Sequence, residues 1–157
     1  MNSIRVLAIP TKVAEKVRAT GKAPGYGHPA HTEVAAGYGP CRHCLRTFNV
    51  GEEKRTLFTY DPFRDIEDVP LPGPIFIHAD GCARYPEDGG YPEQMLPHAS
   101  VLMAYSKGRR LVAELPADGG GQMAAIQTLF EDPSVDYIHV RDQAAGCFDF
   151  RVERGPA

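Results

Sequence analysis

The sequence contains no tryptophan and only four serines, and no apolar run approaches the ~20 residues that a membrane-spanning helix needs. None of the serines lies in a Gly-x-Ser-x-Gly elbow, so the sequence does not indicate a serine hydrolase. Residues 1–10 hold one arginine and a short apolar run, which is not the pattern of a secretory signal. We therefore expect no membrane segment and a cytoplasmic location.

The sequence also has fewer basic than acidic residues. Lysine and arginine total 17 against 20 aspartates and glutamates, which gives a net charge of -3. Non-specific binding to nucleic acid depends on a cluster of positive charge along the phosphate backbone. The acidic balance argues against a nucleic-acid partner and leaves a small molecule or another protein.

The length and composition of the chain are typical of one folded domain. Its 157 residues are 43% hydrophobic and 24% charged, close to globular averages. The 16 glycines and 14 prolines fall between short apolar runs, a pattern typical of short strands joined by turns. We predict a single domain over residues 1–157 with a long loop at about 22–40, where Gly, Pro, Tyr and His recur without a period.

Hydrophobic periodicity predicts two helices and about seven strands. The helices are expected at 12–19 and 122–130, and the strands at 4–9, 54–60, 74–79, 101–105, 110–115, 135–140 and 148–152. The strands at 101–105 and 110–115 flank a glycine-containing turn and predict a hairpin. The expected fold is α+β, built on a mostly antiparallel sheet.

Three local signals refine this prediction. Val13 and Val17 are four residues apart and so share one face of the first helix. Thr11 is expected to cap the start of that helix, and Gly21 to end it. Pro74 should open the strand at 74–79, whose continuous apolar run suggests a central position in the sheet.

Cysteine and histidine are arranged in two suggestive motifs. Cys41 and Cys44 form a Cys-x-x-Cys pair, and His78 and Cys82 form a His-x-x-x-Cys pair at the end of the apolar strand. A tight Cys-x-x-Cys turn places two thiolates at tetrahedral positions about 2.3 Å from one ion. An imidazole and a third thiolate from another strand end would complete the set. The sequence thus predicts a Cys₃His metal site at Cys41, Cys44, His78 and Cys82, with zinc as the cofactor.

Two other interpretations of the cysteines stay open. Free cysteine packs as a small apolar residue, which alone accounts for Cys82 and Cys147, and His78 would then be a buried histidine bonded to a carbonyl. A Cys-x-x-Cys pair can also be a redox centre. A thioredoxin-like motif opens a helix, however, and the stretch from Leu45 to Gly51 is too short for one.

Motifs spread along the chain resemble one known family. They are residues 39–46 (GPCRHCLR), 51–53 (GEE), 59–63 (TYDPF), 73–79 (GPIFIHA) with Cys82, 140–141, 146–148 and 150–154. Together they resemble the bacterial domain of unknown function family DUF1203 over nearly the whole chain. The resemblance implies a single-domain bacterial protein. It implies no activity and no catalytic residue, because the family is named for lacking an assigned activity.

Two functions follow from the cysteine and histidine motifs. The first is a small binding domain whose closed zinc site contributes to folding. The alternative is a thiol-dependent or metal-dependent enzyme that uses the same four side chains. Its thiolate would be activated by His43 or His78 and stabilised by Arg42, with the loop at 22–40 as a lid. His28 or His31 would supply extra ligands in a catalytic metal site.

Overall fold

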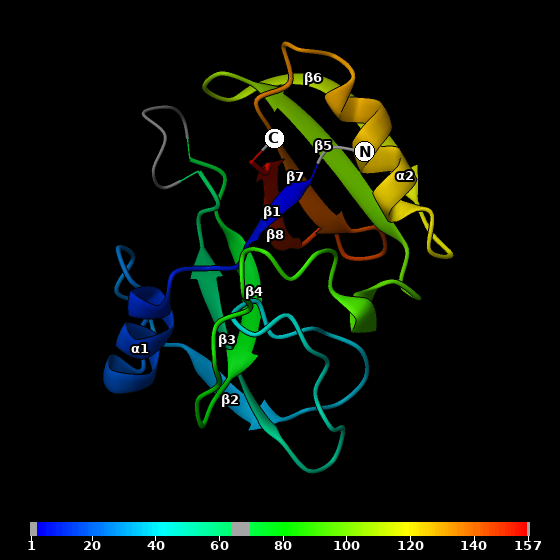
Figure 1. Cartoon of the computed structure of the whole chain (residues 1–157). Helices are drawn as coiled ribbons and strands as arrows, with labels where there is room; N and C mark the ends of the chain where they lie inside the picture. The colour runs from blue at the N-terminus through cyan, green and yellow to red at the C-terminus, as the bar shows by residue number, and fades with distance from the viewer. Residues whose placement is uncertain (1–2, 64–69, 157) are drawn as a thin grey trace.

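The computed structural model describes residues 3–63 and 70–156, which contain eight strands, two α-helices and one 3₁₀ turn (Figure 1). The strands are β1 (Ile4–Leu7), β2 (His31–Val34), β3 (Lys54–Tyr60), β4 (Gly73–His78), β5 (Ser100–Ser106), β6 (Arg110–Ala117), β7 (Tyr137–Asp142) and β8 (Phe148–Arg154). The helices are α1 (Thr11–Thr20) and α2 (Gln122–Phe130), and the 3₁₀ turn is η1 (Glu93–Met95). No helix among these residues is long and apolar enough to cross a membrane.

The strands form two sheets, and every strand pair is antiparallel. One sheet has the order β1-β8-β7-β5-β6, and the other has the order β2-β3-β4. The α+β prediction is confirmed, with eight strands where about seven were expected and two sheets in place of one. The hairpin of β5 and β6 is confirmed as well. Because β1 pairs with β8, the first and last strands of the chain lie side by side (Figure 1).

Each sheet has its own helix and its own apolar core. α2 lies against the five-stranded sheet, while α1 flanks the three-stranded one (Figure 1). Val13 and Val17 are 3% and 1% exposed and pack in the same core as Phe58 and Ile77. The predicted apolar face of α1 is therefore confirmed.

β4 lies at an edge of its sheet, so the predicted central position is wrong. Pro74 is its second residue and faces Thr59 of β3, which is compatible with an edge because proline has no N–H to donate. The apolar run has another cause. Ile75 and Ile77 are buried in the core, and Phe76 on the opposite face packs under the Arg55 guanidinium, 3.9 Å from the ring centroid.

The predicted capping role of Thr11 is also wrong, although Gly21 ends α1 as expected with a φ of 66°. Pro10 occupies the N-cap position, and Thr11 is the first helical residue. The Thr11 hydroxyl lies 3.0 Å from Nε2 of His43 instead. This contact joins the start of α1 to the Cys-x-x-Cys turn.

Two segments differ in detail from the sequence expectation. The stretch at 22–40 contains β2, which pairs with β3 and completes the smaller sheet. β7 begins at Tyr137, two residues later than predicted, because the Val135 N–H turns back to the carbonyl of Asp132. The Arg154 guanidinium donates to the carbonyls of Val135 and Asp132 and fixes that turn.

The turn around Arg42 connects the two sheets. The Arg42 side chain is 4% exposed, and its Nε donates to the carbonyl of Phe148 on β8 at 2.9 Å. Its Nη2 lies 3.1 Å from the carboxylate of Asp149, which is also buried. Burial raises the pKa of Asp149 to about 6, and the positive charge of Arg42 opposes that rise. A buried, partnered guanidinium thus spans from the smaller core to the larger sheet.

His139 on β7 is buried in a cage of aromatic rings. The ring centroids of Phe63, Tyr105, Tyr137 and Phe148 lie 4.7–5.3 Å from its own. Neither ring nitrogen has a hydrogen-bond partner among the described residues. Burial, followed by repulsion from two arginines, lowers the pKa of His139 to about 2. The imidazole is therefore neutral in the folded protein.

This cage predicts a pH-dependent loss of stability. The folded-state pKa of His139 lies below the ~6.5 of an unfolded chain, so unfolding takes up a proton once the pH falls below that value. The contribution is full above about pH 6.5 and is lost at roughly 1.4 kcal/mol per pH unit below it. Denaturant unfolding of wild type and His139→Phe at about pH 7 and about pH 5 should show a smaller pH dependence in the variant.

Because both proteins share every other titrating group, the difference between them isolates His139. His31→Gln, at an exposed position on β2, serves as the control and should keep the wild-type pH dependence. An equal loss of stability in wild type and His139→Phe would contradict the neutral, caged imidazole.

Candidate metal centre

The four predicted ligands come together in the structure. One ligand atom from each of Cys41, Cys44, His78 and Cys82 lies within 4.8 Å of every other. Cys41 is fully buried, Cys44 and His78 are 8% and 9% exposed, and Cys82 is half-buried. Two segments more than thirty residues apart in sequence thus meet as the spacing predicts.

Hydrogen bonds within the turn shape the Cys-x-x-Cys segment. The Cys41 N–H donates to the carbonyl of Arg46 at 2.9 Å, and the Leu45 N–H donates to the carbonyl of Cys41 at 2.8 Å. These bonds fold residues 41–46 into a tight loop that points both thiols the same way. The His78 N–H donates to Sγ of Cys41 at 3.3 Å and joins this loop to the end of β4.

Leu45 carries the one positive φ of a non-glycine residue in the described chain, 57°. Such a conformation costs free energy and persists only where the surroundings fix it. Here Leu45 is 1% exposed and packs in the core of the five-stranded sheet, while Cys44 belongs to the core of the smaller sheet. The chain turns sharply because adjacent side chains must enter different cores.

The separations match a single tetrahedral ion. Bonds of about 2.3 Å to sulfur and 2.0–2.1 Å to nitrogen put tetrahedral ligand atoms roughly 3.5–3.8 Å apart. The Sγ atoms of Cys41 and Cys82 are 3.7 Å apart, and Sγ of Cys44 is 3.4 Å from Nδ1 of His78. These two separations therefore fit ligation of a single tetrahedral ion, and all four ligand atoms lie within 4.8 Å of one another.

His78 is oriented by a carboxylate on its far side. Its Nδ1 faces the thiols, while its Nε2 lies 2.9 Å from Oε2 of Glu53. Metal-binding histidines characteristically donate their second ring N–H to such a group, which fixes the tautomer and increases ligand basicity. Glu53 precedes β3, and the pairing of β3 with β4 brings it beside His78. Glu53 was not among the predicted site residues, because only the strand register places it beside His78.

Cys82 receives two further polar contacts. Nδ1 of His43 lies 3.2 Å from its Sγ, and the Arg18 guanidinium of α1 donates to the same sulfur at 3.4 Å. Arg18 also donates to the carbonyl of His78 at 2.9 Å. The predicted thiolate contact of Arg42 is wrong, because its guanidinium points to β8. The cation beside the thiols is Arg18, for which the sequence offered no motif.

The three titratable groups of the cluster with shifted pKa values are shifted in different directions. Hydrogen bonds from Cys41 and Cys44 lower the pKa of Cys82 strongly, while the pKa of Cys44 is raised by its hydrogen bonds to Cys41 and Cys82 and by burial. Hydrogen bonds to Cys41 and Cys82 raise the pKa of His78 to about 10, against burial. One thiolate is thus stabilised by the other thiols. A divalent cation stabilises three thiolates at once, which this arrangement of protons does not.

The remaining candidates lie outside the cluster. His28 is exposed and bonds to the hydroxyl of Thr59, and His31 lies 3.8 Å from a carboxylate oxygen of Glu33. Neither joins the four ligands, so their predicted role as extra ligands is wrong. Cys147 is a free thiol outside the cluster.

A cavity of about 650 Å³ opens beside the cluster. Cys44, His78 and Cys82 form part of its wall, together with Arg46 and Gln94. No residue of the stretch 22–40 lines it, so the structure does not support the predicted lid.

The orientation of His78 predicts a measurable role for Glu53. Replacing Glu53 with Gln removes the charge that favours the donated N–H, and outer ligands of this kind typically contribute 10–100-fold to metal affinity. Competition with a chromogenic chelator should show Glu53→Gln binding zinc at least about tenfold more weakly than wild type. Glu52→Gln, the adjacent exposed carboxylate, is the matched control and should bind as wild type does. Equal affinities for wild type and Glu53→Gln would exclude this role.

Comparison with known proteins adds one match. Neither the curated proteins nor the solved structures that were compared match this chain. Residues 38–154 match the family described as "Protein of unknown function (DUF1203)", and this range includes all four clustered ligands. That match covers well over half of the sequence and agrees with the resemblance in its motifs, so the chain belongs to the DUF1203 family.

Proposed function

We propose that this chain is a small binding domain of a bacterial, cytoplasmic protein, in which Cys41, Cys44, His78 and Cys82 hold one zinc ion. The observation that carries the proposal is the mutual approach of these four ligand atoms to within 4.8 Å. The donor chemistry supports zinc, because thiolate and imidazole in a tetrahedral set are the preferred ligands of that ion. None of the four cysteines forms a disulfide, which supports a location in a reducing compartment.

Charge compensation supports a bound divalent ion. Three thiolates and Zn²⁺ together carry one negative charge. The Arg18 guanidinium at Cys82 and the His78 N–H at Cys41 both point at these sulfurs and stabilise that charge. These donors therefore favour a metal complex that carries a net negative charge.

The proposed role of the ion is structural. Four protein ligands fill a tetrahedral zinc site and leave no position open for substrate. The ligands come from the loop at 41–44, from the last residue of β4 and from the segment that follows it, and Arg18 adds α1 to the same cluster. Zinc would therefore hold together three parts of the smaller core.

The first prediction from this proposal concerns the metal content of the purified protein. Protein purified without affinity metals or chelators should contain one zinc per chain by elemental mass spectrometry. Three thiols should resist a thiol reagent until chelator is added, and the thiol of Cys147 should react at once. A metal-free chain with four freely titrating thiols would remove the proposal.

The second prediction concerns stability. Metal that binds only the folded state at a thousand times its Kd adds about 4 kcal/mol, or roughly 8–16 °C in Tm for a chain of this size. Cys82→Ala should lose the zinc and melt lower by about that amount. Cys147→Ala, which removes a thiol outside the cluster, should keep both zinc and Tm. If chelator leaves the Tm of the wild-type protein unchanged, the ion has no structural role.

One observation favours a second candidate, a thiol-dependent enzyme. Cys82 is half-buried in the cavity wall, His43 lies 3.2 Å from its sulfur, and Thr11 lies 3.0 Å from the other nitrogen of His43. In this arrangement Cys82 would be the nucleophile, His43 its general base and Thr11 the group that orients the base. The alkylation rates of the metal-free chain separate the two candidates. A Cys82 thiol that is alkylated far faster than Cys147, and slows in His43→Ala, would favour the enzyme.

A further inference from the structure

Cys82 is the most open of the four proposed ligands. Cys41 is fully buried, and Cys44 and His78 are 8% and 9% exposed, whereas Cys82 is half-buried. Cys82 also lines the cavity of about 650 Å³, and Cys41 does not. A small reagent that enters this cavity therefore meets the sulfur of Cys82 more readily than that of Cys44, and does not meet that of Cys41.

A second thiol, that of Cys41, lies beside Cys82. The two Sγ atoms are 3.7 Å apart. This separation suits two ligands of one ion, and it has to shorten to about 2.05 Å in a disulfide. Cys41 is fixed in its buried turn, where its N–H donates to the carbonyl of Arg46. Cys82 lies outside the helices and strands of the structure and follows Gly81, whose φ is 103°. Cys82 is therefore the partner that moves.

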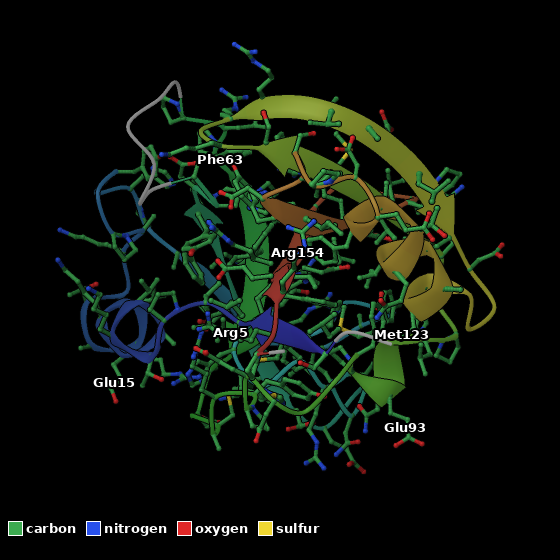
Figure 2. The ribbon with its side chains drawn as sticks, turned by 45° about the horizontal axis from the view of Figure 1, so that its top comes forward. Arg5, Glu15, Phe63, Glu93, Met123 and Arg154 are labelled. Carbon is green, nitrogen blue, oxygen red and sulfur yellow. The ribbon has the colours of Figure 1, made fainter. Side chains whose placement is uncertain are left out.

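The cation beside Cys82 favours attack of its sulfur on an oxidant. The Arg18 guanidinium donates to Sγ of Cys82 at 3.4 Å, and Nδ1 of His43 lies 3.2 Å from the same atom. Glu15, three residues before Arg18 on α1, is exposed and points outward (Figure 2), and no ion pair joins the two in the described chain. When a thiolate attacks a peroxide, negative charge moves to the departing oxygen. The Arg18 guanidinium is placed to stabilise that charge.

From the open sulfur of Cys82, the adjacent thiol of Cys41 and the cation at Arg18, we propose that Cys82 is an oxidation site for a hydroperoxide, and that its oxidation releases the zinc ion. The proposal rests on the zinc site proposed above and adds its regulation. Zinc keeps the sulfur of Cys82 in the thiolate form, which is the form that peroxides oxidise. The oxidant is small, so it reaches a sulfur that the ion and the cavity wall shield from a larger thiol reagent.

The reaction has two steps. In the first, the sulfur of Cys82 forms a bond to one oxygen of hydrogen peroxide, the O–O bond breaks, and the other oxygen leaves as hydroxide and takes a proton from solvent. In the second, the thiolate of Cys41 attacks the sulfenic acid of Cys82, the S–S bond forms, the S–O bond breaks, and a second hydroxide takes a proton. Two thiolates thus give two electrons, and the peroxide becomes two molecules of water. Cys44 and His78 remain as two of the four ligands, too few for a structural zinc site.

Cys147 provides an internal comparison. It is half-buried like Cys82, but it lies outside the cluster, and its sulfur contacts the carbonyl of Ala145 at 4.0 Å. A free thiol of ordinary pKa is only about 3% thiolate near neutral pH, whereas a metal-bound thiol is fully deprotonated. Cys147 should therefore be oxidised more slowly than Cys82, and to a sulfenic or sulfinic acid instead of a disulfide within the chain.

The test is a stepwise addition of hydrogen peroxide to the zinc-loaded, full-length protein. A chromogenic chelator follows the release of zinc, and peptide mapping by mass spectrometry follows each cysteine. One zinc should be released for each disulfide formed between Cys41 and Cys82. Oxidation of Cys82 should be at least about tenfold faster than that of Cys147. Dithiothreitol should then restore both thiols and the capacity to bind zinc. Cys147→Ala should release zinc at the wild-type rate.

Cys41→Ser and Cys44→Ser are a matched pair of variants, because each removes one sulfur of the Cys-x-x-Cys turn and one proposed ligand. Only the first removes the proposed partner of Cys82. Under peroxide, Cys44→Ser should still form the disulfide between Cys41 and Cys82. Cys41→Ser should accumulate the sulfenic acid of Cys82, which a dimedone probe detects. This comparison needs no bound ion, so it holds even where both variants lose zinc.

The zinc content before peroxide is added separates this proposal from the proposed function. A chain without zinc would remove both. A zinc-loaded chain that keeps its ion while Cys147 is oxidised would overturn only the regulation, as would a disulfide between Cys41 and Cys44 in place of the one at Cys82. Equal rates of disulfide formation at Cys82 in Cys41→Ser and Cys44→Ser would also overturn it.

Discussion

The structure depends on one buried turn, residues 40–46, whose consecutive side chains enter different parts of the molecule. Cys41 and Cys44 enter the thiol cluster, Arg42 enters the other sheet, and Leu45 enters the larger core. A buried guanidinium without a partner is strongly unfavourable, so Arg42 fixes the turn against Asp149 and the carbonyl of Phe148. The position of the thiols therefore follows from how the sheets dock.

Electrostatics then explain why a cation would stabilise this turn. Three thiols and an imidazole are packed at ligand distance, three of the four side chains are buried, and a cluster of that kind is stabilised by one divalent charge. The groups around it act on the same complex from outside. Glu53 orients His78, and Arg18 offsets the negative charge at Cys82. Because Arg18 is on α1, the electrostatics of the cluster also position that helix over the smaller sheet.

The sequence predicted the parts of this arrangement that depend on local spacing. The two-residue gap between Cys41 and Cys44, and the strand ending at His78, were enough to name four ligands. Residues whose contacts depend on long-range geometry could not be predicted from the sequence. Glu53 reaches His78 only through the register of β3 and β4, and Arg18 reaches Cys82 only through the placement of α1. Arg42 was assigned to the thiolate because it is adjacent in sequence, whereas adjacent side chains in a tight turn diverge.

The segment after β4 contributes both to the thiol cluster and to the packing of the chain that follows β1. Cys82 belongs to the thiol cluster, and Arg84, two residues later, binds the chain that follows β1. Their anchors are separate. Cys82 is held by the other ligands and Arg18, while Arg84 is held by the carbonyls of Ala8 and Ile9. Since no anchor of Arg84 is a metal ligand, the contact between this segment and the chain after β1 does not depend on the ion.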